Sequence, residues 1–205
     1  MALVKYNNNS ISAVTATAIP SGSLVLIKTL TASSSATLSF VHGTDGVVLD
    51  STYPIYKFEF INIHPATGSY FEFNLSTDSG ANYNVTKTST FFNAVHNESD
   101  SVAILTYRTG DDLAQSTAYQ HLRGGYTGNL SDECISGFLT LFNPSSTTYV
   151  KHFISRSNNT ESDYCADSFL AGYGNTTSAI DAIQFKFSSG NIDAGKIKLY
   201  GIKDS

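Results

Sequence analysis

The sequence predicts an all-β protein, a two-sheet antiparallel β-sandwich of jelly-roll type with at most one short helix. Apolar and polar residues alternate with a period of two in successive segments of the 205-residue chain, as in half-buried strands. Clusters of Gly, Pro, Asn and Ser separate these segments, with turn signals roughly every 8–15 residues. Helical patterns are nearly absent: only Asp111–Ser116 could form a single turn, whose aspartates would favour its N-terminal end.

The chain is expected to consist of an N-terminal arm, residues 1–11, followed by one jelly-roll domain, residues 12–205. The arm is rich in Asn, and it is either a frayed terminus or a segment ordered only against a neighbouring subunit. In the second case Leu3, Tyr6 and Ile11 would be its contact residues. The rest of the chain has no linker or shift in composition, and its length suits a single all-β domain.

The first clear hairpin is predicted in the first half of the chain. Aromatic residues of Ile55–Phe60 alternate with Lys57 and Glu59, and Tyr70–Leu75 repeats the pattern. The intervening His64–Ser69 contains Pro and Gly and is typical of a turn. We therefore expect two paired strands whose aromatic faces point into the core.

A second hairpin is predicted from the strand Ile135–Phe142, the turn Asn143–Ser146 and the returning strand Thr148–Ile154. Shorter or weaker alternating segments predict the remaining strands. These are Ser12–Ala18, Ser23–Leu30, Ala36–Val41, Thr90–Val95, Val102–Tyr107, Tyr119–Arg123 and Tyr164–Tyr173.

A third hairpin is predicted at the C-terminal end. The segment Ile183–Phe187 alternates cleanly, Ser188–Asn191 is typical of a turn, and Ile192–Ile202 leads back along the first strand. Ile202 is out of phase with Leu199, which indicates a bulge or bend at Gly201.

The composition argues against several classes of partner. Only 14% of residues are charged, compared with roughly 25% in an ordinary soluble domain, and the net charge is −5. No basic face is expected, so the sequence predicts no nucleic-acid binding. No segment approaches the roughly 20 apolar residues of a membrane span, and the N-terminus does not resemble a signal peptide. Cys134 and Cys165 are expected to be free thiols, with a bridge between adjacent strands as the alternative.

The sequence predicts no catalytic residue, no cofactor and no metal site. Phosphate-binding glycine loops and a Gly-x-Ser-x-Gly elbow are missing, and the five histidines lack metal-ligand spacing. Glu59 and Glu72 could face each other across the first hairpin as a glycosidase pair, but two solvated strand carboxylates are the expected arrangement. Loop aspartates such as Asp45 and Asp78 could bind calcium, but turn formation is their expected role.

Carbohydrate binding is a stronger alternative. His121–Tyr126 is expected to be an exposed loop with an aromatic tip, and Tyr119, Arg123 and Tyr126 are candidate contact residues for a sugar or a protein. Tyrosine suits either role because it buries a large ring and keeps one polar group.

The chain resembles virion proteins of marine tailed bacteriophages, in segments spread along most of its length. The resemblance is strongest in Ser178–Ile202 and extends to Phe138–Phe153, with its Leu141–Ser145 core, and to Asn7–Ile11. It implies a lectin-like jelly-roll in the virion, with a decoration or fibre role. It brings no catalytic residues to carry over.

We therefore expect a non-enzymatic structural protein on the exterior of a phage particle, made in the host cytoplasm. It would act as a capsid decoration (cement) protein, most simply a homotrimer, that contacts the major capsid protein or other virion proteins. The alternative is a tail-fibre or receptor-binding module that recognises host surface glycans. An enzyme is the third hypothesis, and it lacks a supporting constellation.

Overall fold

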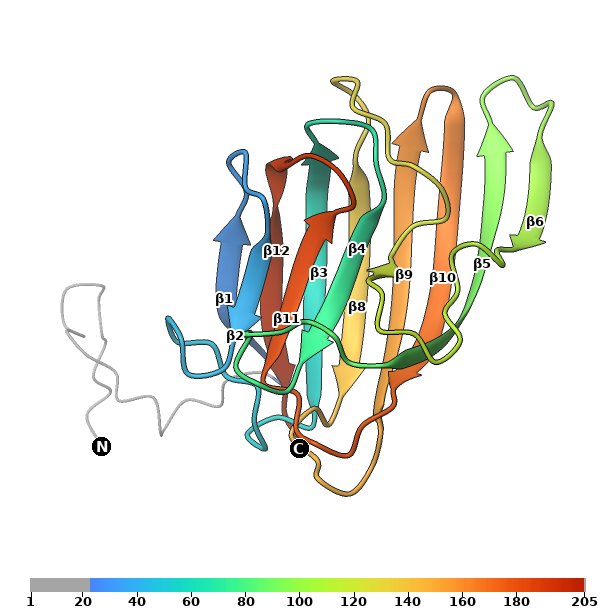
Figure 1. Cartoon of the computed structure of the whole chain (residues 1–205). Helices are drawn as coiled ribbons and strands as arrows, with labels where there is room; N and C mark the ends of the chain where they lie inside the picture. Colours follow the sequence, from blue (N-terminus) through green and yellow to red (C-terminus); the bar gives the residue numbers. More distant parts are fainter. Residues whose placement is uncertain (1–22, 205) are drawn as a thin grey trace, which may run out of the picture.

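The fold is a two-sheet antiparallel β-sandwich. The computed structural model describes residues 23–204, which form twelve strands and no helix (Figure 1). The larger sheet has the order β1 (Leu24–Thr31), β12 (Ile192–Ile202), β3 (Ile55–Pro65), β8 (Ile135–Phe142), β9 (Lys151–Glu161), β10 (Tyr164–Gly174), β5 (Lys87–Asn97) and β6 (Ala103–Tyr107). The smaller has the order β2 (Leu38–Val41), β11 (Ala182–Phe187), β4 (Phe71–Ser76) and β7 (Gln120–His121).

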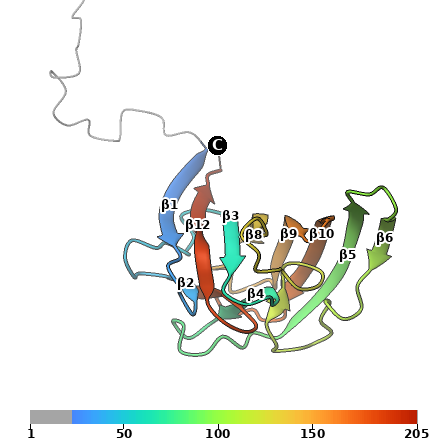
Figure 2. The same cartoon turned by 90° about the horizontal axis from the view of Figure 1, so that it is seen from above.

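The two sheets differ in width, so the smaller one covers only part of the larger. Figure 2 shows the eight-stranded sheet as one continuous layer from β1 to β6, with β2 and β4 on one side of it. The inner surface beyond β8 is covered instead by the chain around residues 108–124. Ser157 on β9 donates a 2.7 Å hydrogen bond to the Leu122 carbonyl, and the Gly124 amide donates to Ser168 on β10. Small polar residues on β9 and β10 therefore bind a loop at the place where the other strands of the large sheet pack against the small sheet.

The core lies between the sheets and is centred on Phe185 of β11. Its ring centroid lies 5.3–6.3 Å from the rings of five other phenylalanines. These come from both sheets: Phe40, Phe58, Phe60, Phe71 and Phe73. All six are buried, which agrees with the inward faces predicted from the alternation in β3, β4 and β11.

The predicted pairing of strands is confirmed for the second hairpin and wrong for the first and third. β8 and β9 pair antiparallel, with Leu141 opposite Phe153. In contrast, β3 and β4 belong to different sheets, as do β11 and β12. A period-two pattern reports which face of a strand is buried, but it does not report whether the turn stays in one sheet or crosses to the other. The chain crosses in both of these cases.

The bulge or bend predicted at Gly201 is wrong, and the single helical turn that Asp111–Ser116 could form does not occur. Gly201 keeps a regular register with Tyr56, and the irregularities of β12 lie between Ile192 and Lys196 instead. Glycine occupies position 201 because Tyr53 packs over it: a Cβ there would lie 2.4 Å from atoms of that ring. Asp111–Ser116 is not helical, because Asp111 uses its carboxylate on neighbouring side chains and Ser116 pairs with β5.

Most remaining strands form where expected, with shifted ends. The predicted strand Tyr119–Arg123 shrinks to β7, which has two residues, whereas the strands on either side of the 162–163 turn are longer than expected. The predicted strand Ser12–Ala18 and the arm 1–11 lie outside the described residues.

Candidate docking surface

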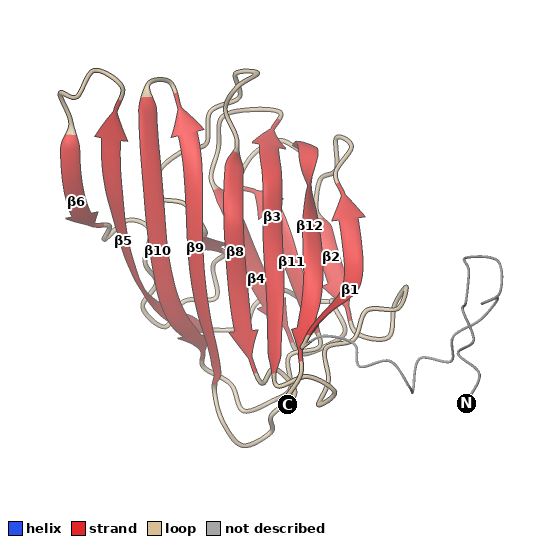
Figure 3. Ribbon diagram, turned by 180° about the vertical axis from the view of Figure 1, so that it is seen from behind, coloured by secondary structure: helices blue, strands red, loops and turns tan. Residues whose placement is uncertain are grey.

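The open face of the eight-stranded sheet is the candidate functional surface, and we call it the outer face. Figure 3 shows it uncovered from β1 to β6. Along β9 buried and exposed residues alternate strictly, with His152, Ile154 and Arg156 on the outer face. The same alternation in β10 and β5 brings Phe169 and Phe92 to this side.

Cross-strand pairing assembles an aromatic row on the outer face. The register aligns one residue from each of five successive strands, β8, β9, β10, β5 and β6: Phe138, Arg156, Phe169, Phe92 and Tyr107. The Phe92 and Phe169 rings stack at 4.8 Å with an interplanar angle of 6°. The Arg156 guanidinium lies 4.8 Å from the Phe169 centroid, within range of a cation–π contact. These contacts fix a flat aromatic platform that stays open to solvent.

The charges next to the aromatic row are neutralised within the chain. Arg156 donates hydrogen bonds to both carboxylate oxygens of Asp167, and the Nη2–Oδ2 distance is 2.6 Å. Hydrogen bonding to Asp167 raises the pKa of the Arg156 guanidinium. Lys57 pairs with Glu59 at 2.9 Å further along the same face. The part of the outer face around the aromatic row therefore presents apolar area with little net charge.

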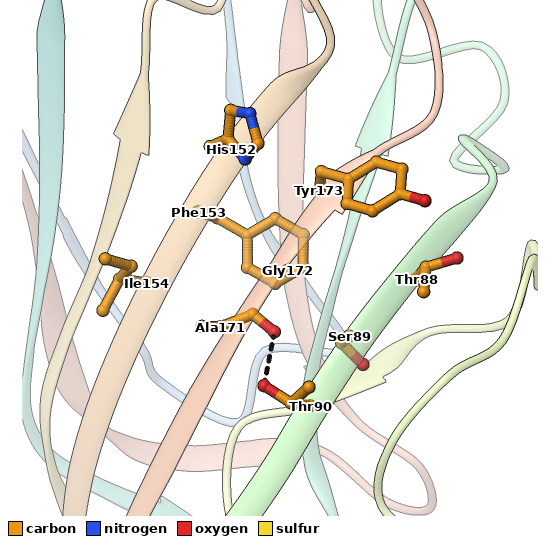
Figure 4. Close-up of a pocket in the computed structure, with 9 residues that line it drawn as sticks. All are labelled: Thr88, Ser89, Thr90, His152, Phe153, Ile154, Ala171, Gly172 and Tyr173. Carbon is orange, nitrogen blue, oxygen red and sulfur yellow. Dashed lines mark hydrogen bonds between the residues drawn. The ribbon is translucent and has the colours of Figure 1, made fainter.

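A shallow groove of about 460 Å³ lies beside the aromatic row, across β9, β10 and β5 (Figure 4). Ala171 forms part of its lining, with Ile154 and Thr90 on the neighbouring strands and the rings of His152 and Tyr173 toward one end. Thr90 Oγ1 donates to the Ala171 carbonyl at 3.4 Å, so the hydroxyl is directed along the sheet surface. The groove is mostly apolar, and its titratable side chains are His152 and Tyr173, which suits packing rather than bond chemistry.

A second, smaller cluster lies on the opposite side of the molecule, around β7. The His121 ring stacks on Tyr70 at 4.1 Å and 5°, and the Tyr126 ring lies 4.5 Å from Tyr70. Asp111 is 2.8 Å from His121 Nδ1 and from Arg108 Nε. Burial opposes ionisation of Asp111, but these hydrogen bonds outweigh it and hold the pKa of the carboxyl below its usual value. We call this group the tyrosine cluster.

The candidate residues predicted from the sequence fall in different places. Tyr126 is an exposed aromatic tip, as expected, with 55% of its surface open. Tyr119 is half-buried and donates a 2.6 Å hydrogen bond to Gln184, and burial raises its pKa to about 12. Arg123 is buried and pairs with Glu161, so its expected position in an exposed loop is wrong. The loop folds inward because Leu122, next to Arg123, enters the core. Leu3, Tyr6 and Ile11 lie outside the described residues.

The expected arrangement of two carboxylates is also corrected. Glu59 is on the outer face beside Lys57, whereas Glu72 is on β4 in the other sheet, buried and 3.3 Å from Lys186. The two groups are therefore not a facing pair, and Glu72 is not solvated. Both corrections follow from the position of Glu72 in the smaller sheet, which the alternation of residues does not reveal.

Sequence reasoning missed the main residues of the outer face. Phe91–Phe92 and Phe169–Leu170 place large apolar side chains at consecutive positions, so each strand is apolar on both faces. Consecutive large apolar residues in a strand were the sequence feature that could have indicated an apolar surface outside the core.

Other features of residues 23–204 bear on the remaining expectations. Cys134 is half-buried and Cys165 exposed, and both are free thiols. No group of three or more His, Cys, Asp or Glu side chains in the described part is arranged to hold a metal ion. The described residues also include no helix suited to crossing a membrane. Comparisons of the chain with protein-family models, curated proteins and solved structures found no match.

Proposed function

We propose that this chain is a non-enzymatic structural protein of a phage virion, a decoration protein that attaches to the particle through its outer face. The observation that carries the proposal is the exposed apolar area of that face. Phe92 is 40% exposed, Ile154 49% and Tyr107 51%, and the first and last belong to one aligned row. Monomeric soluble proteins rarely leave contiguous apolar patches of more than a few hundred Å² open.

The chemistry of the outer face favours a protein partner. Interface cores are rich in aromatic residues and Arg and poor in Lys and Glu, and a standard interface buries about 800 Å² on each side. The aromatic row contains four aromatic residues and one arginine, whose charge Asp167 balances. Such a surface could be buried without leaving an unpaired charge.

The identity of the partner rests on the resemblance of residues 138–153 and 178–202 to virion proteins. It favours the major capsid protein, or another protein of the particle exterior, as the surface on which the chain docks. We also predict that the chain forms a homotrimer and that it lies on the outside of the particle.

Phe92→Glu is expected to reduce co-sedimentation of the purified protein with phage shells at least tenfold. The substitution adds a carboxylate to the centre of the apolar face, and burying that charge without a partner is costly. Leu130→Glu is the matched control, because Leu130 is 61% exposed but lies in a loop outside the aromatic row. Equal loss in both variants, or no loss in Phe92→Glu, would contradict the proposal.

A second candidate function, recognition of host glycans, is favoured by the tyrosine cluster. Tyr126 offers an exposed ring that lies against Tyr70, and the partly exposed guanidinium of Arg108 lies near the adjacent Gly125. The cluster therefore combines a stacking surface with a polar group, as a sugar site does. Tyr126→Ala is expected to abolish any signal on a glycan array, whereas Tyr149→Ala, at a residue 70% exposed, should leave it unchanged. An unchanged array signal in Tyr126→Ala would exclude this site.

A further inference from the structure

The free edge of β6 is a second surface that the particle-binding role does not use. β6 is the last strand of the eight-stranded sheet and pairs only with β5. The Arg108 amide donates to the Phe91 carbonyl at 2.9 Å, and the Asn97 amide donates to the Val102 carbonyl at 3.2 Å. Hydrogen-bonded pairs alternate along an antiparallel ladder, so these two bonds fix its phase.

This phase determines which backbone groups of β6 are unpaired. Residues at even positions, such as Ile104 and Thr106, direct their N–H and C=O groups toward β5. Residues at odd positions, Ala103, Leu105 and Tyr107, direct theirs away from the sheet. The edge therefore offers three pairs of donors and acceptors to another strand.

The β6 edge lacks the usual protection against strand pairing. Natural edge strands carry Lys, Pro, inward charges or bulges that discourage added strands. Ala103–Tyr107 has no charge and no proline, and its register with β5 is unbroken. All five residues are exposed, with Leu105 72% open. The opposite edge, β1, contains Lys28 and an irregularity at Ile27.

We propose that two copies of this chain pair antiparallel along β6, about a two-fold axis that relates Leu105 to the partner's Leu105. In this register Ala103 faces the partner's Tyr107, and Ile104 faces the partner's Thr106. Ala103 and Thr106 are the smaller members of their pairs, Leu105 meets its own copy at the axis, and no charge opposes another. The sequence of β6 is therefore self-complementary, as an interface with two-fold symmetry requires.

Pairing in this way also extends the outer face. Leu105 and Tyr107 share the outer face with Ala94 and Phe92, the residues opposite them on β5. The paired copies would form one continuous sheet with two aromatic rows. A two-fold contact at β6 is compatible with a separate three-fold association and would then join neighbouring trimers.

Leu105→Lys is expected to lower the molar mass measured by light scattering at equal protein concentration, to half the wild-type value where the β6 contact alone joins the copies. Two lysines would face each other at the axis and would repel in the paired state. Leu105→Pro should have the same effect, because it removes an amide that points away from β5 and leaves the pairing with β5 intact. Leu26→Lys, on exposed β1, is the matched control and should keep the wild-type mass.

A cysteine scan tests the register. In a variant in which Cys134 and Cys165 are replaced by Ser, Leu105→Cys should form a covalent dimer in air. Hydrogen-bonded antiparallel pairs have Cα atoms about 5.5 Å apart, within the range of a disulfide. Ala103→Cys should not form a covalent dimer, because in the proposed register Ala103 faces the partner's Tyr107 and the two introduced cysteines are far apart. A wild-type mass equal to that of Leu105→Lys would overturn the proposal, as would crosslinking of Ala103→Cys as fast as Leu105→Cys.

Discussion

Phe185→Ala is expected to lower the free energy of unfolding by about 3–5 kcal/mol, the cost of truncating a fully buried phenylalanine. Phe185 is buried and contacts rings from both sheets, including Phe58 of β3 and Phe73 of β4. The cavity left behind would lie where the two layers meet, and strands on either side are held in place by their own hydrogen bonds. Relaxation around the cavity should therefore be small.

Denaturant unfolding of the wild-type and variant proteins measures this loss. Phe92→Ala is the control, because it makes the same chemical change on the outer face, where the ring is 40% exposed. Its loss should be well below that of Phe185→Ala. Equal losses would mean that the core is not centred between the two sheets as described.

Lys87→Met is expected to remove a rise in stability that the wild-type protein shows between pH 7 and 8.5. Lys87 is fully buried, and burial lowers its pKa to about 7. Its Nζ donates hydrogen bonds to Asn74 Oδ1 and to the Val85 carbonyl, the latter at 2.8 Å. The side chain is therefore accommodated best as a neutral amine.

The sign of the effect follows from proton binding in the two states. Above pH 7 the folded protein has released the Lys87 proton, whereas the unfolded chain keeps it up to about pH 10.5. The unfolded state then binds more protons, so the free energy of unfolding rises with pH, by up to about 1.4 kcal/mol per pH unit. Below pH 7 both states are protonated, the slope from this residue disappears, and the cost of burying the charge is fully present.

Unfolding free energies at several pH values between 7 and 8.5 check this prediction. The wild-type curve should be steeper than the Lys87→Met curve over that interval. Lys57→Met is the control, since Lys57 is partly exposed and paired with Glu59, and it should leave the slope unchanged. Parallel curves for wild type and Lys87→Met would show that the Lys87 amine stays protonated in the folded state.

The positions of the strands could be predicted from the sequence, but the sheet to which each strand belongs could not. Alternation located β3, β4 and β11 and identified their buried faces, because that pattern depends only on local burial. It did not reveal that His64–Ser69 and Ser188–Asn191 carry the chain from one sheet to the other. Sheet membership depends on contacts between segments far apart in sequence, such as Phe40 against Phe185.

The same limit applies to the functional surface. Tyr126 was predicted as an exposed tip because a Gly-rich loop signals exposure locally. Arg123, three residues earlier, is buried and forms an ion pair with Glu161 of β9. The two residues are far apart in the sequence, so the local pattern does not predict this pair. The aromatic row combines residues of five strands, so no single segment predicts it.

Electron microscopy of an intact phage particle to which this chain is bound shows which surface of the sandwich contacts the shell. We expect density for the sandwich on the outside of the shell, with Phe92 and Phe169 facing the shell protein. Density in which the outer face is open to solvent, or in which another surface of the chain contacts the shell, would contradict the proposed function.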